Sequence, residues 1–190
     1  MTQEIEIEFK NLLTKKEFDL LLSQLPFPMD GIKQTNYYFE TDDFSLKSKG
    51  SALRIREKEG NYYLTLKEPH MLGLLETHEQ ITKEEAYKWR NNEFVPKATI
   101  SKQLTNLGIV EKELRFLGEL TTIRREIPYH GTLLVLDYSI YNNESDYELE
   151  LEANNKDDGI YTFQQILDTF QIERKETPNK IERFYRSLLK

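Results

Sequence analysis

The feature that most constrains the fold is a strict alternation of charged and apolar side chains near the start of the chain, EIEIEFK at residues 4–10. Successive side chains of a β-strand point to opposite faces, so this stretch predicts a strand with a charged face and an apolar face. An ordinary half-buried strand turns its charges to water. A strand that lines an enclosed polar cavity uses them as metal ligands or acid-base groups.

The same alternation returns along the chain. Strands are predicted at residues 4–10, 33–41, 51–59, 62–67, 74–80, 114–127, 132–141 and 147–153. Capping boxes that begin at Thr14 and Thr82 predict helices, and further helices are expected over 96–107, 158–170 and 180–189. Closing the sheet leaves no exposed edges, so we expect an α+β fold: an eight-stranded antiparallel β-barrel with helices packed outside, as one domain over residues 1–190.

Composition narrows the class of function. The net charge of −7 and the pI near 5.2 argue against nucleic acids and anionic membranes as partners, because both require a basic surface. The chain has no cysteine, which excludes disulfides, thiolate zinc sites and cysteine nucleophiles. No apolar run approaches the roughly 18 residues of a membrane span, and the first residues do not resemble a signal peptide. We expect a cytoplasmic protein, either a monomer or a homodimer.

The polar faces of the predicted strands carry two kinds of side chain. Taken singly, each charged pair is typical of a solvated surface, but Asp137 interrupts an apolar strand and would be costly to bury without a partner. The hard oxygen ligands suit Mg²⁺ or Mn²⁺: Glu6, Glu8, Asp137, Glu148, Glu150 and Glu152. The cations suit a ligand with several phosphates: Lys10, Arg54, Arg56, Lys67 and Arg124, together with Lys180 from the last predicted helix. No glycine-rich phosphate loop is present, which argues against Walker and Rossmann sites.

These motifs, in this order, resemble the CYTH superfamily, the triphosphate tunnel metalloenzymes. Residues 6–10 (EIEFK) match the Glu-x-Glu-x-Lys signature, 53–56 (LRIR) the Leu-Arg-x-Arg strand, and 64–67 (LTLK) the lysine strand that follows. The order of the family's remaining motifs is also kept, with Arg124, Asp137, the alternating glutamates of residues 148–152, and Asn179-Lys180. The resemblance covers nearly the whole chain.

The resemblance implies a tunnel that binds a triphosphate, with the six cations on the phosphates and the six carboxylates on divalent ions or the attacking water. It implies catalytic roles for Glu6 and Glu148, and Lys67 is our candidate for the proton donor to the leaving group. Two departures stand out. Thr122 occupies a position where some members carry a lysine, and the fifth strand carries His78 beside Glu76, in a register that the sequence leaves open.

The family includes inorganic, thiamine and RNA 5′-triphosphatases and class IV adenylyl cyclases. We expect metal-dependent hydrolysis of inorganic tripolyphosphate or of a small organic triphosphate, since no base-recognition motif is evident. The alternatives are a cyclase that makes cyclic AMP from ATP, and a polyphosphate- or nucleotide-binding module without activity.

Overall fold

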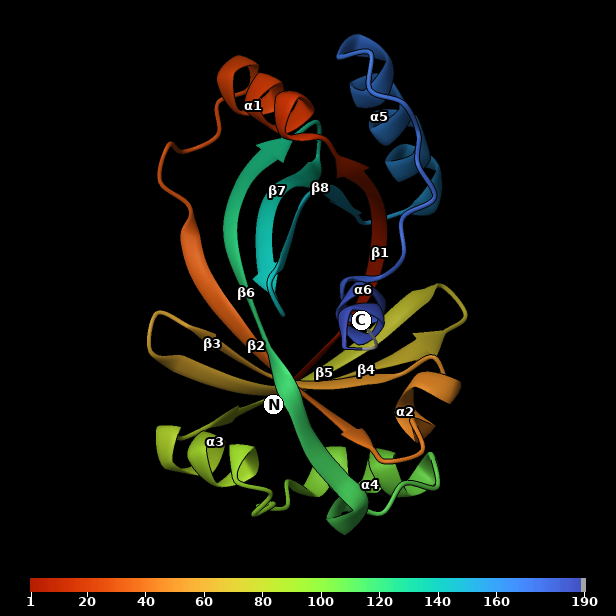
Figure 1. Cartoon of the computed structure of the whole chain (residues 1–190). Helices are drawn as coiled ribbons and strands as arrows, with labels where there is room; N and C mark the ends of the chain where they lie inside the picture. The colour runs from red at the N-terminus through yellow and green to blue at the C-terminus, as the bar shows by residue number, and fades with distance from the viewer. Residues whose placement is uncertain (189–190) are drawn as a thin grey trace. The chain divides into compact units, whose positions relative to one another are not determined.

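The computed structural model describes residues 1–188 (Figure 1). The strands are β1 (Thr2–Leu13), β2 (Ile32–Thr41), β3 (Ala52–Lys58), β4 (Asn61–His70), β5 (Gly73–Ile81), β6 (Leu114–Tyr129), β7 (Thr132–Tyr141) and β8 (Glu144–Ala153). The helices are α1 (Lys15–Gln24), α2 (Ser45–Ser48), α3 (Lys83–Arg90), α4 (Ala98–Asn106), α5 (Lys156–Thr169) and α6 (Lys180–Ser187), with a 3₁₀ turn, η1, at Glu111–Glu113.

The strands are hydrogen-bonded in a closed order, β1-β5-β4-β3-β2-β6-β7-β8, which makes an eight-stranded barrel. Pairing is antiparallel between β1 and β8, along the run β2-β3-β4-β5, and along β6-β7-β8. The predicted α+β fold class is therefore confirmed.

Contacts within the chain divide the structure into two compact units. Unit 1 contains residues 1–5 and 34–120, and unit 2 contains residues 6–33 and 121–190. Strands β1, β2 and β6 each contribute residues to both units. The expectation of a single domain over 1–190 stays a prediction, and its last two residues lie outside the part of the chain that the structure describes.

Unit 1 has its own apolar core between its strands and its helices. Leu53, Ile55, Leu64 and Leu66, from β3 and β4, are fully buried. They cluster with apolar residues of α3 and α4, including the buried Trp89 (Figure 1). Because the apolar side chains of these strands face the helices, the alternate residues of β3 and β4 occupy the opposite face of the sheet.

Unit 2 repeats this plan with a separate core. Leu134, Leu136, Leu149 and Leu151 of β7 and β8 cluster with apolar residues of α1 and α5 (Figure 1). Helix α5 packs tightly here, since a Cβ added at Gly159 would lie 2.2 Å from the ring of Phe9. The charged residues of β7 and β8 therefore lie on the face away from these helices.

The local signals of the sequence are largely confirmed. Both predicted capping boxes form, at Thr14 for α1 and at Thr82 for α3. Helix α2 was not predicted, and the strand predicted over residues 62–67 extends further, to His70. The last helix was predicted to reach residue 189, which lies outside the described residues. Within residues 1–188, no helix is long and apolar enough to cross a membrane.

Candidate active site

A buried set of charges occupies the polar face of unit 2. We call it the Arg124 cluster, and its members are Arg124, Asp137, Glu148, Glu150, Lys180 and Arg183. Strand pairing assembles its centre, because Arg124 lies opposite Asp137, and Asp137 lies opposite Glu148. Arg124 donates from Nε and Nη2 to Asp137 at 2.9 and 2.6 Å, and from Nη2 to Glu150 at 2.5 Å. Asp137 thus has the partner that its burial in an apolar strand demands.

Lys180 enters the cluster from the first turn of α6. Its Nζ lies 2.5 Å from Asp137, 2.9 Å from Glu150 and 3.1 Å from Glu148. Burial alone would lower the pKa of Lys180, but the charges of the three carboxylates outweigh burial and raise it above its ordinary value. The predicted grouping of Arg124 and Lys180 with these acids is therefore present in the structure.

Arg183 is a member of the cluster that the sequence did not reveal. It lies one turn after Lys180 on α6, and its guanidinium donates to both oxygens of Glu148 at 3.0 and 2.8 Å. It also binds Asp146 at 2.8 Å. The strong segregation of polar and apolar residues on α6 was the available signal, but it does not say which polar residue points inward.

A second group of carboxylates lies next to the Arg124 cluster in unit 2. Glu8 and Glu152 are opposite one another on β1 and β8. Burial, together with the charges of Glu6, Glu150 and Glu8, raises the pKa of Glu152 to about 7 despite the opposing charge of Arg124. Excess negative charge is therefore concentrated around Glu8 and Glu152, where β1 pairs with β8.

Lys10 connects β1 with the segment that carries α6. Its Nζ contacts Glu8 and donates at 2.6 Å to the side chain of Asn179, the residue before Lys180. Burial would raise the pKa of Glu150, but the charges of Lys180 and Arg124 keep that pKa low, and Lys10 adds a smaller effect in the same direction. Lys10 is thus placed with the predicted cations of unit 2.

The predicted cations of unit 1 gather around a carboxylate whose role the sequence left open. Glu76 of β5 is 1% exposed. It accepts from Lys67 Nζ at 2.8 Å and from Arg54 Nη2 at 3.2 Å. Burial alone would raise its pKa, but the charges of Arg54 and Lys67 outweigh burial and lower it. We call this group, with Glu4, Thr65 and His78, the Glu76 cluster.

Arg56 shares the polar face of β3 with Arg54. Its Nε donates to Asn36 of β2 at 3.1 Å, which fixes the direction of the guanidinium. Across β4, Thr65 lies opposite both Arg54 and His78, so the register missing from the sequence places His78 beside these cations.

Two groups in residues 1–188 bring three ligating atoms within 4.8 Å of one another: Asp137 with Glu148 and Glu150, and Glu4 with Glu76 and His78. Lysine and arginine already neutralise the first group. An additional cation therefore fits better towards Glu152, where burial and mutual repulsion have raised a carboxyl pKa. Clustered hard oxygen donors of this kind suit Mg²⁺ or Mn²⁺.

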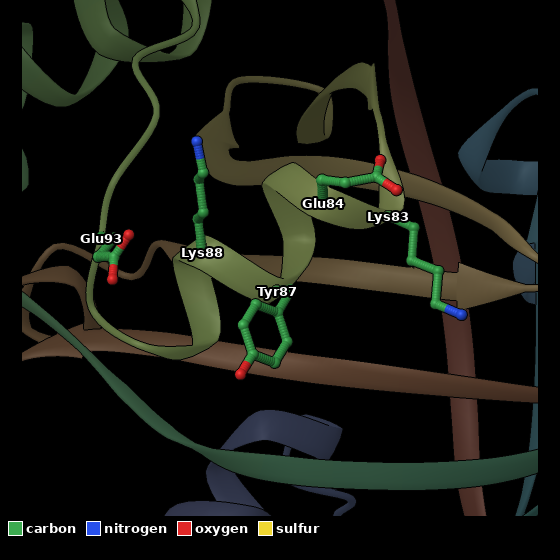
Figure 2. Close-up of a pocket in the computed structure, with 5 residues that line it drawn as sticks. All are labelled: Lys83, Glu84, Tyr87, Lys88 and Glu93. Carbon is green, nitrogen blue, oxygen red and sulfur yellow. The ribbon is translucent and has the colours of Figure 1, made fainter.

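A shallow pocket on unit 1 does not have the character of an active site. Figure 2 shows its lining on α3 and the loop that follows: Lys83, Glu84, Tyr87, Lys88 and Glu93. These side chains extend in different directions and do not converge on one point (Figure 2). The two charge clusters are the stronger candidates.

Comparison with known proteins gives a consistent result. The "Putative triphosphatase YjbK" of Bacillus subtilis (strain 168) is 46% identical over 186 residues, which are 97% of this chain and 96% of that protein. A Bacillus halodurans crystal structure described as a putative adenylate cyclase is 45% identical, with a TM-score of 0.93 over 97% of this chain and 100% of that one.

A Hippeastrum protein, described as a putative adenylyl cyclase with a dominant triphosphatase activity, has a TM-score of 0.78. The alignment covers 96% of each chain, and at 24% identity it supports the fold alone. The family model named CYTH domain matches residues 4–185, which span both charge clusters. Sequence motifs, fold and relatives thus agree, and this chain belongs to the CYTH family.

Proposed function

We propose that this protein hydrolyses a triphosphate with the help of Mg²⁺ or Mn²⁺, and that inorganic tripolyphosphate or a small organic triphosphate is its substrate. The observation that carries the proposal is the Arg124 cluster, where Arg124 of β6 and Lys180 of α6, both largely enclosed, pair with buried carboxylates on one face of β7 and β8. Such an array offers cations to phosphate oxygens and oxygens to a divalent ion. The similarity to a protein named as a triphosphatase supports the same class of reaction.

The proposal assigns phosphate contacts to Arg54, Arg56 and Lys67 of unit 1, and to Lys10, Arg124 and Lys180 of unit 2. This assignment follows the family's motif order, and substitutions within each set test it separately. Lys10, Arg54, Lys67, Arg124 and Lys180 now bind carboxylates, so substrate phosphates would replace one anionic partner by another at these cations.

Phosphoryl transfer requires positioning and charge compensation more than covalent chemistry. A divalent ion held by Glu6, Glu8, Glu150 and Glu152 would compensate phosphate charge and acidify bound water. Because the pKa of Glu152 is raised to about 7 in the metal-free protein, an ion that binds there would displace its proton near neutral pH. Glu6 and Glu148 are proposed to orient the water, and Lys67 is proposed to protonate the leaving group.

Neighbouring arginines provide a matched test. Arg124 points into the cluster, whereas Arg125 faces the other side of β6 and donates to the backbone oxygens of Pro28 and Met29. Arg124→Met should reduce phosphate release from tripolyphosphate by about a hundredfold or more, the order expected when a preorganised charged donor is removed. Arg125→Met should leave it nearly unchanged. Equal rates in two folded variants would contradict the assignment.

The cyclase reading has one specific observation in its favour, the description of the 45% identical Bacillus halodurans protein. Incubating this protein with ATP and Mn²⁺ distinguishes a cyclase from a hydrolase, because a cyclase yields cyclic AMP and diphosphate, whereas a hydrolase yields phosphate. Tight triphosphate binding without either product would instead indicate a binding module.

A further inference from the structure

His78 is held from two sides in a way that fixes its ring. Its Nδ1 lies 2.9 Å from the hydroxyl of Thr65 on β4, and its Nε2 lies 3.0 Å from Oε1 of Glu4 on β1. These contacts connect three neighbouring strands, β4, β5 and β1, within unit 1. The imidazole, only 18% exposed, therefore has a defined orientation.

The same ring approaches the carboxylate that holds two predicted phosphate-binding cations. Nε2 of His78 is 3.4 Å from Oε2 of Glu76. Glu76 also binds Lys67 at 2.8 Å and Arg54 at 3.2 Å. Three side chains thus share one buried carboxylate, and the position of His78 is itself fixed by Thr65 and Glu4.

The hydrogen-bond chemistry indicates how His78 acts. A neutral imidazole has one N–H and one acceptor nitrogen. Two carboxylates face Nε2 and a hydroxyl faces Nδ1, so the hydrogen on Nε2 is the favoured arrangement, with Thr65 donating to Nδ1. That N–H donates to Glu4 at 3.0 Å, and its partial positive charge also lies beside Oε2 of Glu76, 3.4 Å from Nε2, where it draws part of this carboxylate's charge away from Lys67 and Arg54. Those cations are then easier to share with an incoming anion.

We propose that His78 is a positioning residue that orients Glu76 and thereby sets how strongly Lys67 and Arg54 bind substrate phosphate. The proposal rests on the triphosphatase function proposed above and deepens it, because it names the group that controls phosphate affinity in unit 1. It predicts an effect on substrate binding and little effect on the chemical step.

Shape-preserving substitutions test this role. His78→Phe removes both ring nitrogens but keeps a planar ring, and Thr65→Val removes the hydroxyl that fixes Nδ1. Each should raise the KM for tripolyphosphate, His78→Phe by about tenfold, the size expected when a hydrogen bond to a charged group is lost. The kcat should stay within about twofold. His78→Gln, which retains a donor and an acceptor, should recover part of the affinity.

The control is His130→Asn. His130 is an exposed turn residue of unit 2 with a φ of 47°, a conformation that asparagine tolerates, so this change removes a histidine without loss of structure. The double variant Thr65→Val/His78→Phe should show a KM close to that of His78→Phe alone, because Thr65 acts through His78. Additive effects would show that the two residues act independently, against the proposal.

The possible outcomes distinguish a failure of the role proposed for His78 from a failure of the proposed triphosphatase function. An active wild-type protein with an unchanged KM in folded His78→Phe would overturn the inference and leave the triphosphatase proposal standing. A fall in kcat at constant KM would overturn it too. If the wild-type protein neither cleaves tripolyphosphate nor binds it in a calorimetric titration, the proposed function fails and the inference fails with it.

Discussion

Replacing Lys180 with methionine removes the ammonium group shared by three buried carboxylates. Its Nζ lies 2.5 Å from Asp137, 2.9 Å from Glu150 and 3.1 Å from Glu148, and methionine can replace none of these interactions. Asp137 is fully buried, so water cannot take the place of the lysine there. Removing one member of a buried ion pair costs about 3–5 kcal/mol. We expect Lys180→Met to lower the free energy of unfolding by that amount at pH 8.

After Lys180→Met, the Arg124 cluster carries one excess negative charge, because its other ion pairs remain. Arg124 stays bound to Asp137 and Glu150, and Arg183 stays bound to Glu148. The excess charge raises the carboxyl pKa values in the folded variant, so the cluster takes up a proton as the pH falls. The penalty should therefore be smaller at pH 5 than at pH 8.

Denaturant unfolding followed by circular dichroism, at pH 5 and pH 8, measures both effects. At about 2–4 °C per kcal/mol, the melting temperature should also fall by roughly 10 °C at pH 8. Lys15→Met is the control, because Lys15 pairs with Asp19 on the surface, where solvent screens the pair and its loss should change stability little. Equal losses in the two variants, or a larger loss at pH 5, would refute the reasoning.

Three further outcomes follow from the geometry. Mn²⁺ affinity should rise about tenfold from pH 6 to pH 8 in a calorimetric titration, because Glu152, with a pKa of about 7, must lose its proton when the ion binds. Glu152→Gln should remove most of this rise, and a wild-type Mn²⁺ affinity that does not change with pH would contradict a metal site at Glu152. Gly159→Ala should cost about 1–3 kcal/mol in thermal unfolding, because the added Cβ meets Phe9 at 2.2 Å, and unchanged stability would show that α5 can shift. Arg56→Lys keeps the charge but loses the Nε bond to Asn36, so KM should rise severalfold at similar kcat in steady-state assays, and an unchanged KM would remove Arg56 from phosphate binding.

The sequence predicts the parts of the fold that depend on short-range patterns. Period-two alternation predicts which strand residues share a polar face: Arg54, Arg56, Lys67 and Arg124. The short turn between β6 and β7 sets the register of this strand pair, which places Arg124 opposite Asp137. The capping boxes mark where α1 and α3 begin for the same local reason.

What the sequence does not predict depends on contacts between distant residues. Arg183 reaches Glu148 across 35 positions, and a polar helix face alone does not select it. The place of His78 depends on the pairing register of β5 with β4. Helix α2 is only four residues long and begins where the buried carboxylate of Glu40 accepts the backbone N–H groups of Leu46 and Lys47, an interaction that no local periodicity encodes.

The most direct test of the proposed function is the initial rate of phosphate release from tripolyphosphate by the wild-type protein, with Mn²⁺ or Mg²⁺ and with EDTA. We expect release with a divalent ion and essentially none with EDTA, since phosphate charge must be compensated and water activated. Absence of release with either metal, or an equal rate in EDTA, would contradict the proposal that this CYTH protein is a metal-dependent triphosphatase.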